Sequence, residues 1–232
     1  MMLSTDSHST PILQPRYLKR AILLPVLTAA CLAIVSGCAS VPSQRKELSQ
    51  QQSCCASPRE FVFRALPLLL DAAEEITLDT PIYRFPGGNS HFIPYELEPT
   101  PRGKARRIDI GSTKQSGVPG FPIRSYFHPE VTLYDGEFRE VGHAGQEVFF
   151  ARTGGLFNAS VNVDGTLLIT HGSRAKYLVI HTTDETMAMN RISQQQTSLF
   201  YLRYAVVITS SLAVYEAAPR GRLLVKSTLV DD

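Results

Sequence analysis

The chain has 232 residues, 44% of them hydrophobic and 19% charged, and a formal net charge of +2. This length allows one domain with a sizeable core. The small net charge gives no indication of a nucleic-acid-binding surface, so nucleic acid is not an expected partner.

The first 37 residues have the three parts of a secretory signal peptide. A basic stretch at residues 16–20 is followed by an apolar run at residues 21–35 and then by small residues before Cys38. The apolar run is too short to be a good membrane span. Residues 1–37 are therefore predicted to be a cleaved leader.

The residues Val35-Ser36-Gly37-Cys38 resemble the lipobox of bacterial lipoproteins. Acyl chains on Cys38, palmitate among them, would hold the protein to a membrane, since each buried CH₂ contributes about 0.8 kcal/mol. By resemblance to enterobacterial sorting rules, Ala39 favours the outer membrane, with the domain facing the periplasm. The alternative is an ordinary signal peptide in which Cys38 is incidental.

Removal of the leader takes away three of the 23 basic residues and one of the 21 acidic residues, which leaves 20 of each. Residues 38–56 are rich in Gln and Ser, a composition typical of a flexible tether. We therefore expect a lipid-anchored tether at 38–56 and a single domain at 57–232.

Cys54 and Cys55 are the remaining cysteines of the mature chain. In an oxidising compartment they are expected to be modified or bridged. A bridge between the two, a bridge to another chain and a redox pair remain open. The chain has no second Cys or His pair at metal-ligand spacing, so no metal and no cofactor are expected.

The domain is predicted to begin with a short helix. Ser57 and Glu60 form a capping box around Pro58, and Pro67 must end or bend the helix. Further along, the basic cluster at residues 102–107, which includes Arg106, is interpreted as a solvated loop leading into a strand; contact with anionic lipid or sugar is the alternative.

Beyond residue 75 the pattern changes to short strands separated by turn residues. The predicted strands are 76–79, 91–97, 107–111, 131–134, 147–152, 160–163, 176–182 and 222–229. Turns are predicted at 86–89, 135–136 and 164–165. The uninterrupted apolar run 177–180 predicts a central strand that is buried on both faces.

Residues 183–196 are predicted to form a polar helix, and the apolar segment 199–215 a buried helix or strand. The fold class is therefore mainly β: a β-sandwich-like single domain with a short N-terminal helix and one C-terminal helical segment.

Several of these features, in this order, resemble the maltose operon periplasmic protein family. They are Cys54-Cys55 before a short helix, the strand from Ile76, the run 88–92, the block 128–135 and the strand 177–183. The resemblance implies a periplasmic protein associated with maltose or maltodextrin transport, and it implies no defined reaction and no functional residues. The lipobox and the segment 199–215 depart from the family pattern.

Three functions are weighed, none of them catalytic, because the chain has no recognisable catalytic motif. The first is a lipoprotein accessory to carbohydrate transport that acts by protein contact. The second is a direct carbohydrate-binding module, in which Tyr126, Phe127 and His128 would contact the ligand; core packing is the alternative for these residues. The third is an envelope adaptor unrelated to sugar uptake.

Overall fold

The computed structural model describes residues 40–113, 123–153, 161–189, 191–202 and 205–232. Residues 41–232 form one compact unit, described here by itself. The predicted leader and Cys38 lie outside the described residues. The elements in chain order are α2 (Val41–Gln50), η1 (Pro58–Glu60), β1 (Arg64–Leu66), β2 (Leu70–Ile76), β3 (Ile82–Phe85), β4 (Gly88–His91), β5 (Ile93–Leu97), β6 (Lys104–Thr113), β7 (Ile123–Phe127), β8 (Glu130–Tyr134), β9 (Glu140–Ala144), β10 (Phe150–Thr153), β11 (Val161–Thr170), β12 (Tyr177–His181), α3 (Asp184–Met189), β13 (Arg191–Leu202), β14 (Ala205–Ala218) and β15 (Gly221–Asp231).

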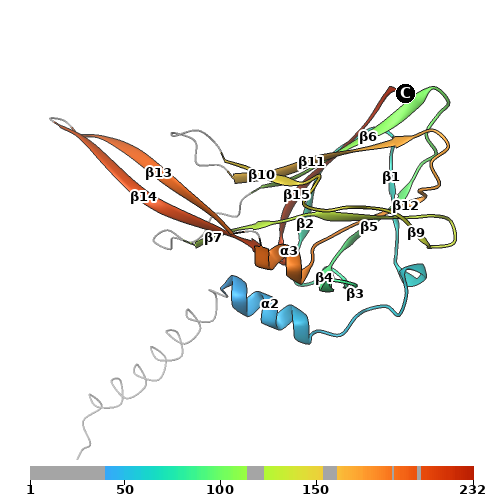
Figure 1. Ribbon diagram of the computed structural model, residues 1–232, viewed down its shortest axis with the longest axis horizontal. Helices are drawn as coiled ribbons and strands as arrows, with labels where there is room; N and C mark the ends of the chain where they lie inside the picture. The colour runs from blue at the N-terminus through green and yellow to red at the C-terminus, as the bar shows by residue number, and fades with distance from the viewer. Residues whose placement is uncertain (1–39, 114–122, 154–160, 190, 203–204) are drawn as a thin grey trace, which may run out of the picture. The chain divides into compact units, whose positions relative to one another are not determined.

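Two five-stranded sheets form the body of this unit, which confirms the predicted β-sandwich-like fold (Figure 1). The β12 sheet has the strand order β1-β5-β12-β8-β9, and the β6 sheet has the order β10-β11-β6-β15-β2. One hydrophobic core contains side chains of both sheets, among them Val131 and Ile180 from the first and Ile108 and Val225 from the second. The sheets therefore bury their facing sides against each other.

The β12 sheet is covered on its second face as well. Tyr134, Tyr177 and Val179 belong to an aromatic cluster with Phe85 and Phe92 from the segment that carries β3 and β4. All five residues of β12 are buried, so the central strand predicted from the run 177–180 is confirmed. Strands buried on both faces read as continuous apolar runs, which is why this one was visible in the sequence.

In the β6 sheet, buried and more exposed side chains instead alternate along β2, β6 and β15. In β15, Leu223 and Val225 face the core, and Leu224 and Lys226, which alternate with them, face outward. One face of this sheet is therefore open to solvent, as in many antiparallel sheets.

The segment 199–215, predicted as a buried helix or strand, belongs to the hairpin of β13 and β14, which pairs in parallel with β7. The predicted helix 183–196 ends at Met189, and residues 191–196 are strand. Among the described residues, no helix is long and apolar enough to cross a membrane.

The predicted tether contains helix α2, so the folded unit begins at Val41 and not at residue 57. Val41 and Leu48 are buried on one face of this helix. The side-chain amide of Asn89 donates to the carbonyls of Leu48 and Gln51 at 3.2 and 2.9 Å, which holds the helix end. Composition indicated a tether because only two apolar side chains fix the helix.

The predicted N-terminal helix is a single 3-10 turn, η1, followed by strand β1. Glu60 does reach back, accepting from the backbone N–H of Ala56 at 3.0 Å, but Ser57 makes no side-chain cap. The chain leaves the helical conformation at Phe61, whose backbone is extended.

The predicted turn at Asp164-Gly165 is wrong, because both residues lie inside strand β11. Gly165 serves close packing: a Cβ there would lie 2.4 Å from the ring of Phe149 and 2.8 Å from the carbonyl oxygen of Val148. The glycine is needed for the approach of a neighbouring segment and not for a bend.

Arg106 was expected in a solvated loop, but it is fully buried in β6. Its Nη2 donates to the carbonyls of Leu66 and Pro67, both at 2.6 Å, and its Nε donates to Ser227 Oγ at 2.9 Å. Nη1 donates to the carbonyl of Glu98 at 3.3 Å. Arg106 therefore ties the chain around β1, in one sheet, to β6 and β15 in the other.

Candidate functional site

Two cysteines among the described residues, Cys54 and Cys55, form a disulfide with each other. Among the alternatives left open by the sequence, the structure shows the bridge between neighbours. The backbone N–H of Cys54 donates to the carbonyl of Ile82 at 2.8 Å, so the pair is held beside strand β3.

Tyr126, Phe127 and His128, predicted as ligand contacts, are buried in the structure, with exposed fractions of 0, 0 and 1%. Tyr126 and Phe127 belong to the hydrophobic core, the alternative noted for them from the sequence. Burial lowers the pKa of His128 to about 4, so its ring is neutral at neutral pH. None of the three offers a surface to a ligand in this structure.

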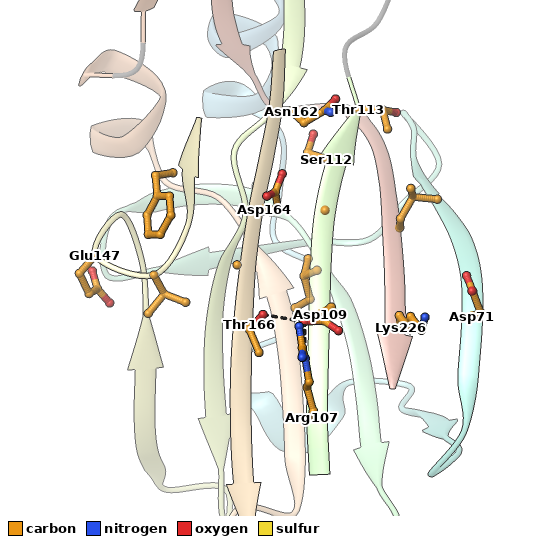
Figure 2. Close-up of a pocket in the computed structure, with 16 residues that line it drawn as sticks. Asp71, Arg107, Asp109, Ser112, Thr113, Glu147, Asn162, Asp164, Thr166 and Lys226 are labelled. Atoms are coloured by element: carbon orange, nitrogen blue, oxygen red, sulfur yellow. Dashed lines mark hydrogen bonds and ion pairs between the residues drawn. The ribbon is translucent and has the colours of Figure 1, made fainter. Parts of the chain in front are cut away.

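A hollow of about 770 Å³ lies on the open face of the β6 sheet (Figure 2). The strand alternation described above turns one side chain of every two toward it. Four of them form a row across β2, β15, β6 and β11, because Asp71 and Asp109 are both paired with Lys226 and Asp109 is also paired with Thr166. The row places carboxylates on both sides of an ammonium group.

Hydrogen bonds fix the centre of this row. Asp109 Oδ1 accepts from Thr166 Oγ1 at 2.6 Å and from Arg107 Nε at 2.9 Å. Figure 2 shows these three side chains side by side on neighbouring strands, with Asp164 and Asn162 further along the face. The face therefore offers donors and acceptors at fixed positions.

The next row of outward-facing cross-strand neighbours includes Gly111 of β6. Because Gly111 has no side chain, the floor of the hollow is open at this point. A Cβ built at Gly111 would have no heavy atom within 4 Å. Leu224 lies opposite Gly111 on β15 and is 45% exposed, and Phe150 at the edge strand is 50% exposed. Half-exposed apolar side chains beside a polar row give the hollow both kinds of contact surface.

A second cavity, of about 520 Å³, lies beside the disulfide. Phe61, Phe92 and the exposed Val62 contribute apolar surface, and Glu74 and Asp79 contribute carboxylates. This cavity is more apolar than the sheet-face hollow and has fewer hydrogen-bonding groups.

One group of described side chains has the composition of a metal site: Glu130, His143 and His181, whose ligand atoms all lie within 4.8 Å of one another. They line a cavity of about 430 Å³ that also contains Glu147. The backbone N–H of Gly145 donates to Glu147 and holds the pKa of that carboxyl below its usual value.

Sequence reasoning did not find the hollow, because its residues come from five strands and meet only through the strand register. Alternation in 107–111 was the available signal, since it turns Arg107, Asp109 and Gly111 to one face. The metal-type group likewise comes from three strands. No family model, no curated protein and no solved structure matches the chain.

Proposed function

We propose that this protein is a non-catalytic, lipid-anchored protein of the bacterial envelope that assists carbohydrate uptake by binding an oligosaccharide in the sheet-face hollow. The observation that carries the proposal is the hollow itself, with its fixed polar row and its half-exposed Phe150. The protein would lie at the outer membrane and face the periplasm.

The envelope location is supported by the lipobox that ends at Cys38 and by the disulfide. Disulfides persist mainly in oxidising compartments such as the periplasm. The resemblance to the maltose operon periplasmic protein family supports maltodextrins as the first ligands to test.

The chemistry of the hollow suits a sugar. Carboxylate, amide and hydroxyl groups such as those of Asp109, Asn162 and Thr166 accept from and donate to sugar hydroxyls. The ring of Phe150 offers an apolar surface for the C–H face of a pyranose. A binding role is favoured over hydrolysis because Asp109 is already engaged by Arg107 and Thr166 and lies on an open sheet face.

Phe150→Ala and Asp109→Asn should each weaken maltoheptaose binding about 10-fold, as measured by calorimetry on the full-length protein in detergent. Loss of an aromatic contact or of a hydrogen bond to a charged group corresponds to about 1.4 kcal/mol, which is a factor of 10. Val62→Ala and Asp79→Asn, which remove an exposed apolar side chain and a carboxylate charge beside the disulfide, are the controls and should leave the affinity unchanged.

Equal weakening by the control variants would move the ligand to the disulfide cavity and overturn the assignment to the sheet face. If the unmodified protein does not bind maltoheptaose, the proposal that its ligand is a maltodextrin is wrong.

A protein partner on the same face is the second candidate. Leu168 and Leu224 on this face are 64% and 45% exposed, and exposed apolar groups of this kind mark protein contacts. Crosslinking through cysteines placed at Leu168 would then capture an envelope protein, and maltoheptaose would not compete with it.

The anchor has its own test. Cys38→Ser should abolish acylation and release the domain from the membrane fraction, because the thiol carries the acyl chains. Fractionation with and without detergent, together with mass spectrometry of the amino end, measures both effects. Cys54→Ser with Cys55→Ser is the control and should remain in the membrane; a Cys38→Ser protein that stays there would contradict the anchor.

A further inference from the structure

Three side chains on the aromatic-covered face of the β12 sheet are placed together by the strand register. His181 in β12 lies directly opposite Glu130 in β8, and His143 in β9 lies opposite Thr132, which shares the face of Glu130. Glu130 Oε2 lies 3.6 Å from His143 Nε2. We propose that Glu130, His143 and His181 bind one divalent cation of the zinc class.

The first observation in favour of this cation site is the environment of Glu130. Its side chain is buried, and within the described ranges its ion-pair partner is His143 alone, whose own side chain is 44% exposed. Buried charges in proteins are generally paired or coordinate metals. A cation bound to Glu130 would place a positive charge beside this buried carboxylate.

The two carboxylate oxygens of Glu130 have different partners. Oε1 accepts from the hydroxyls of Thr183 and Thr186, at 2.8 Å from the first. Oε2 is the oxygen that faces His143. Hydrogen bonds to the outer oxygen orient a ligating carboxylate, as is usual around metal ions.

His181 is held in the same way. Its ring stacks on Phe85 with centroids 3.9 Å apart, and its Nδ1 lies 3.4 Å from the carbonyl oxygen of Thr182. An Nδ1–H directed at a carbonyl makes Nε2 the acceptor of the ring. Nε2 lies 2.9 Å from Thr132 Oγ1, the hydroxyl of the cross-strand neighbour of His143, so this hydroxyl must turn away for Nε2 to bind the cation.

The ligand type selects the metal. Two imidazoles and one carboxylate suit zinc, with bonds of about 2.1 Å and a further position for water or a ligand. Two atoms on one ion at this bond length lie no more than about 4.2 Å apart, so binding must draw the groups inward from their separations of up to 4.8 Å. His143 is the exposed member and can make this movement, and the adjoining cavity of about 430 Å³ leaves the further position accessible.

The test is zinc titration by calorimetry of the full-length protein in detergent, prepared without a histidine tag. One zinc ion should bind per chain, and His143→Ala should weaken binding about 100-fold. His171→Ala, which removes an exposed histidine outside the group, is the matched control and should bind as the unmodified protein does. Magnesium, which prefers oxygen ligands, should not bind at this site.

Two further variants keep the test independent of folding. Glu130→Gln retains an acceptor for the two threonine hydroxyls while removing the charge. Thr183→Val removes the hydroxyl that donates to Glu130 and accepts from the backbone N–H of Thr186. They should weaken zinc binding about 100-fold and about 10-fold respectively, while circular dichroism of the zinc-free proteins stays unchanged. Zinc binding that is absent from the unmodified protein, or equally strong in His143→Ala and Glu130→Gln, would overturn the site.

Discussion

Arg106→Met should lower the free energy of unfolding by about 3–5 kcal/mol, the largest effect expected of any single substitution in the domain. The methionine fills much of the same space but donates no hydrogen bond. The carbonyls of Leu66, Pro67 and Glu98 would then be left without this donor. An unsatisfied buried carbonyl is unfavourable by about 1–3 kcal/mol, so the effects of the three account for the expected loss.

Urea unfolding of Arg106→Met and of Arg107→Met measures this directly. Arg107 is the next residue in β6 but points outward, where it contacts Asp109. Its replacement should change the unfolding free energy by no more than about 0.5 kcal/mol. Equal losses in the two variants would show that Arg106 does not join the two sheets as described.

Gly165→Ala should destabilise the protein by about 2–3 kcal/mol. The added methyl group would lie within 3 Å of the ring of Phe149 and of the carbonyl oxygen of Val148, so the edge of the sheet must shift to admit it. Thermal unfolding should show a clearly lower midpoint.

Gly111→Ala is the matched control, because Gly111 lies on the adjacent strand and is opposite Asp164, the neighbour of Gly165. A methyl group there meets no heavy atom within 4 Å, so stability should change by no more than about 0.5 kcal/mol. A Gly165→Ala protein as stable as Gly111→Ala would contradict the close packing of Phe149 on β11.

The fold class was predictable because the strongest signals in the chain belong to its most buried strand and to its true turns. The run 177–180 gave the central strand, and Asp135-Gly136 gave the turn between β8 and β9. Asp164-Gly165 is the same dipeptide as that turn, but its glycine is present for a different reason: it makes room for Phe149. Composition does not distinguish a bend from a close approach.

Long-range contacts were not predictable. The sequence of helix α2 resembles a tether because the hydrogen bonds that hold the helix come from Asn89, far along the chain. Arg106 resembles one of several basic loop residues because most of its acceptors are backbone carbonyls, which every residue has and which therefore give no signal in the sequence. The ligand contacts predicted at 126–128 were chosen for their aromatic character, and the same property places two of them in the core.

The hollow on the β6 sheet and the metal-type group also depend on contacts between residues far apart in the sequence. Strand alternation shows which residues of a strand share a face, but the strand register decides which strands lie beside it. Lys226 lies between Asp71 and Asp109, and Glu130 lies beside His181, only because of that register. The expectation of no metal rested on the absence of closely spaced ligands, a criterion that does not apply to ligands from three strands.

Hydrogen–deuterium exchange with and without maltoheptaose tests most directly whether the open face of the β6 sheet binds the sugar. We expect slower exchange in β6, β11 and β15 around Asp109, Thr166 and Lys226, with no change beside the Cys54–Cys55 disulfide, and weaker protection in the Phe150→Ala variant at the same sugar concentration. Protection confined to the disulfide cavity, or none anywhere in the chain, would contradict the proposed function.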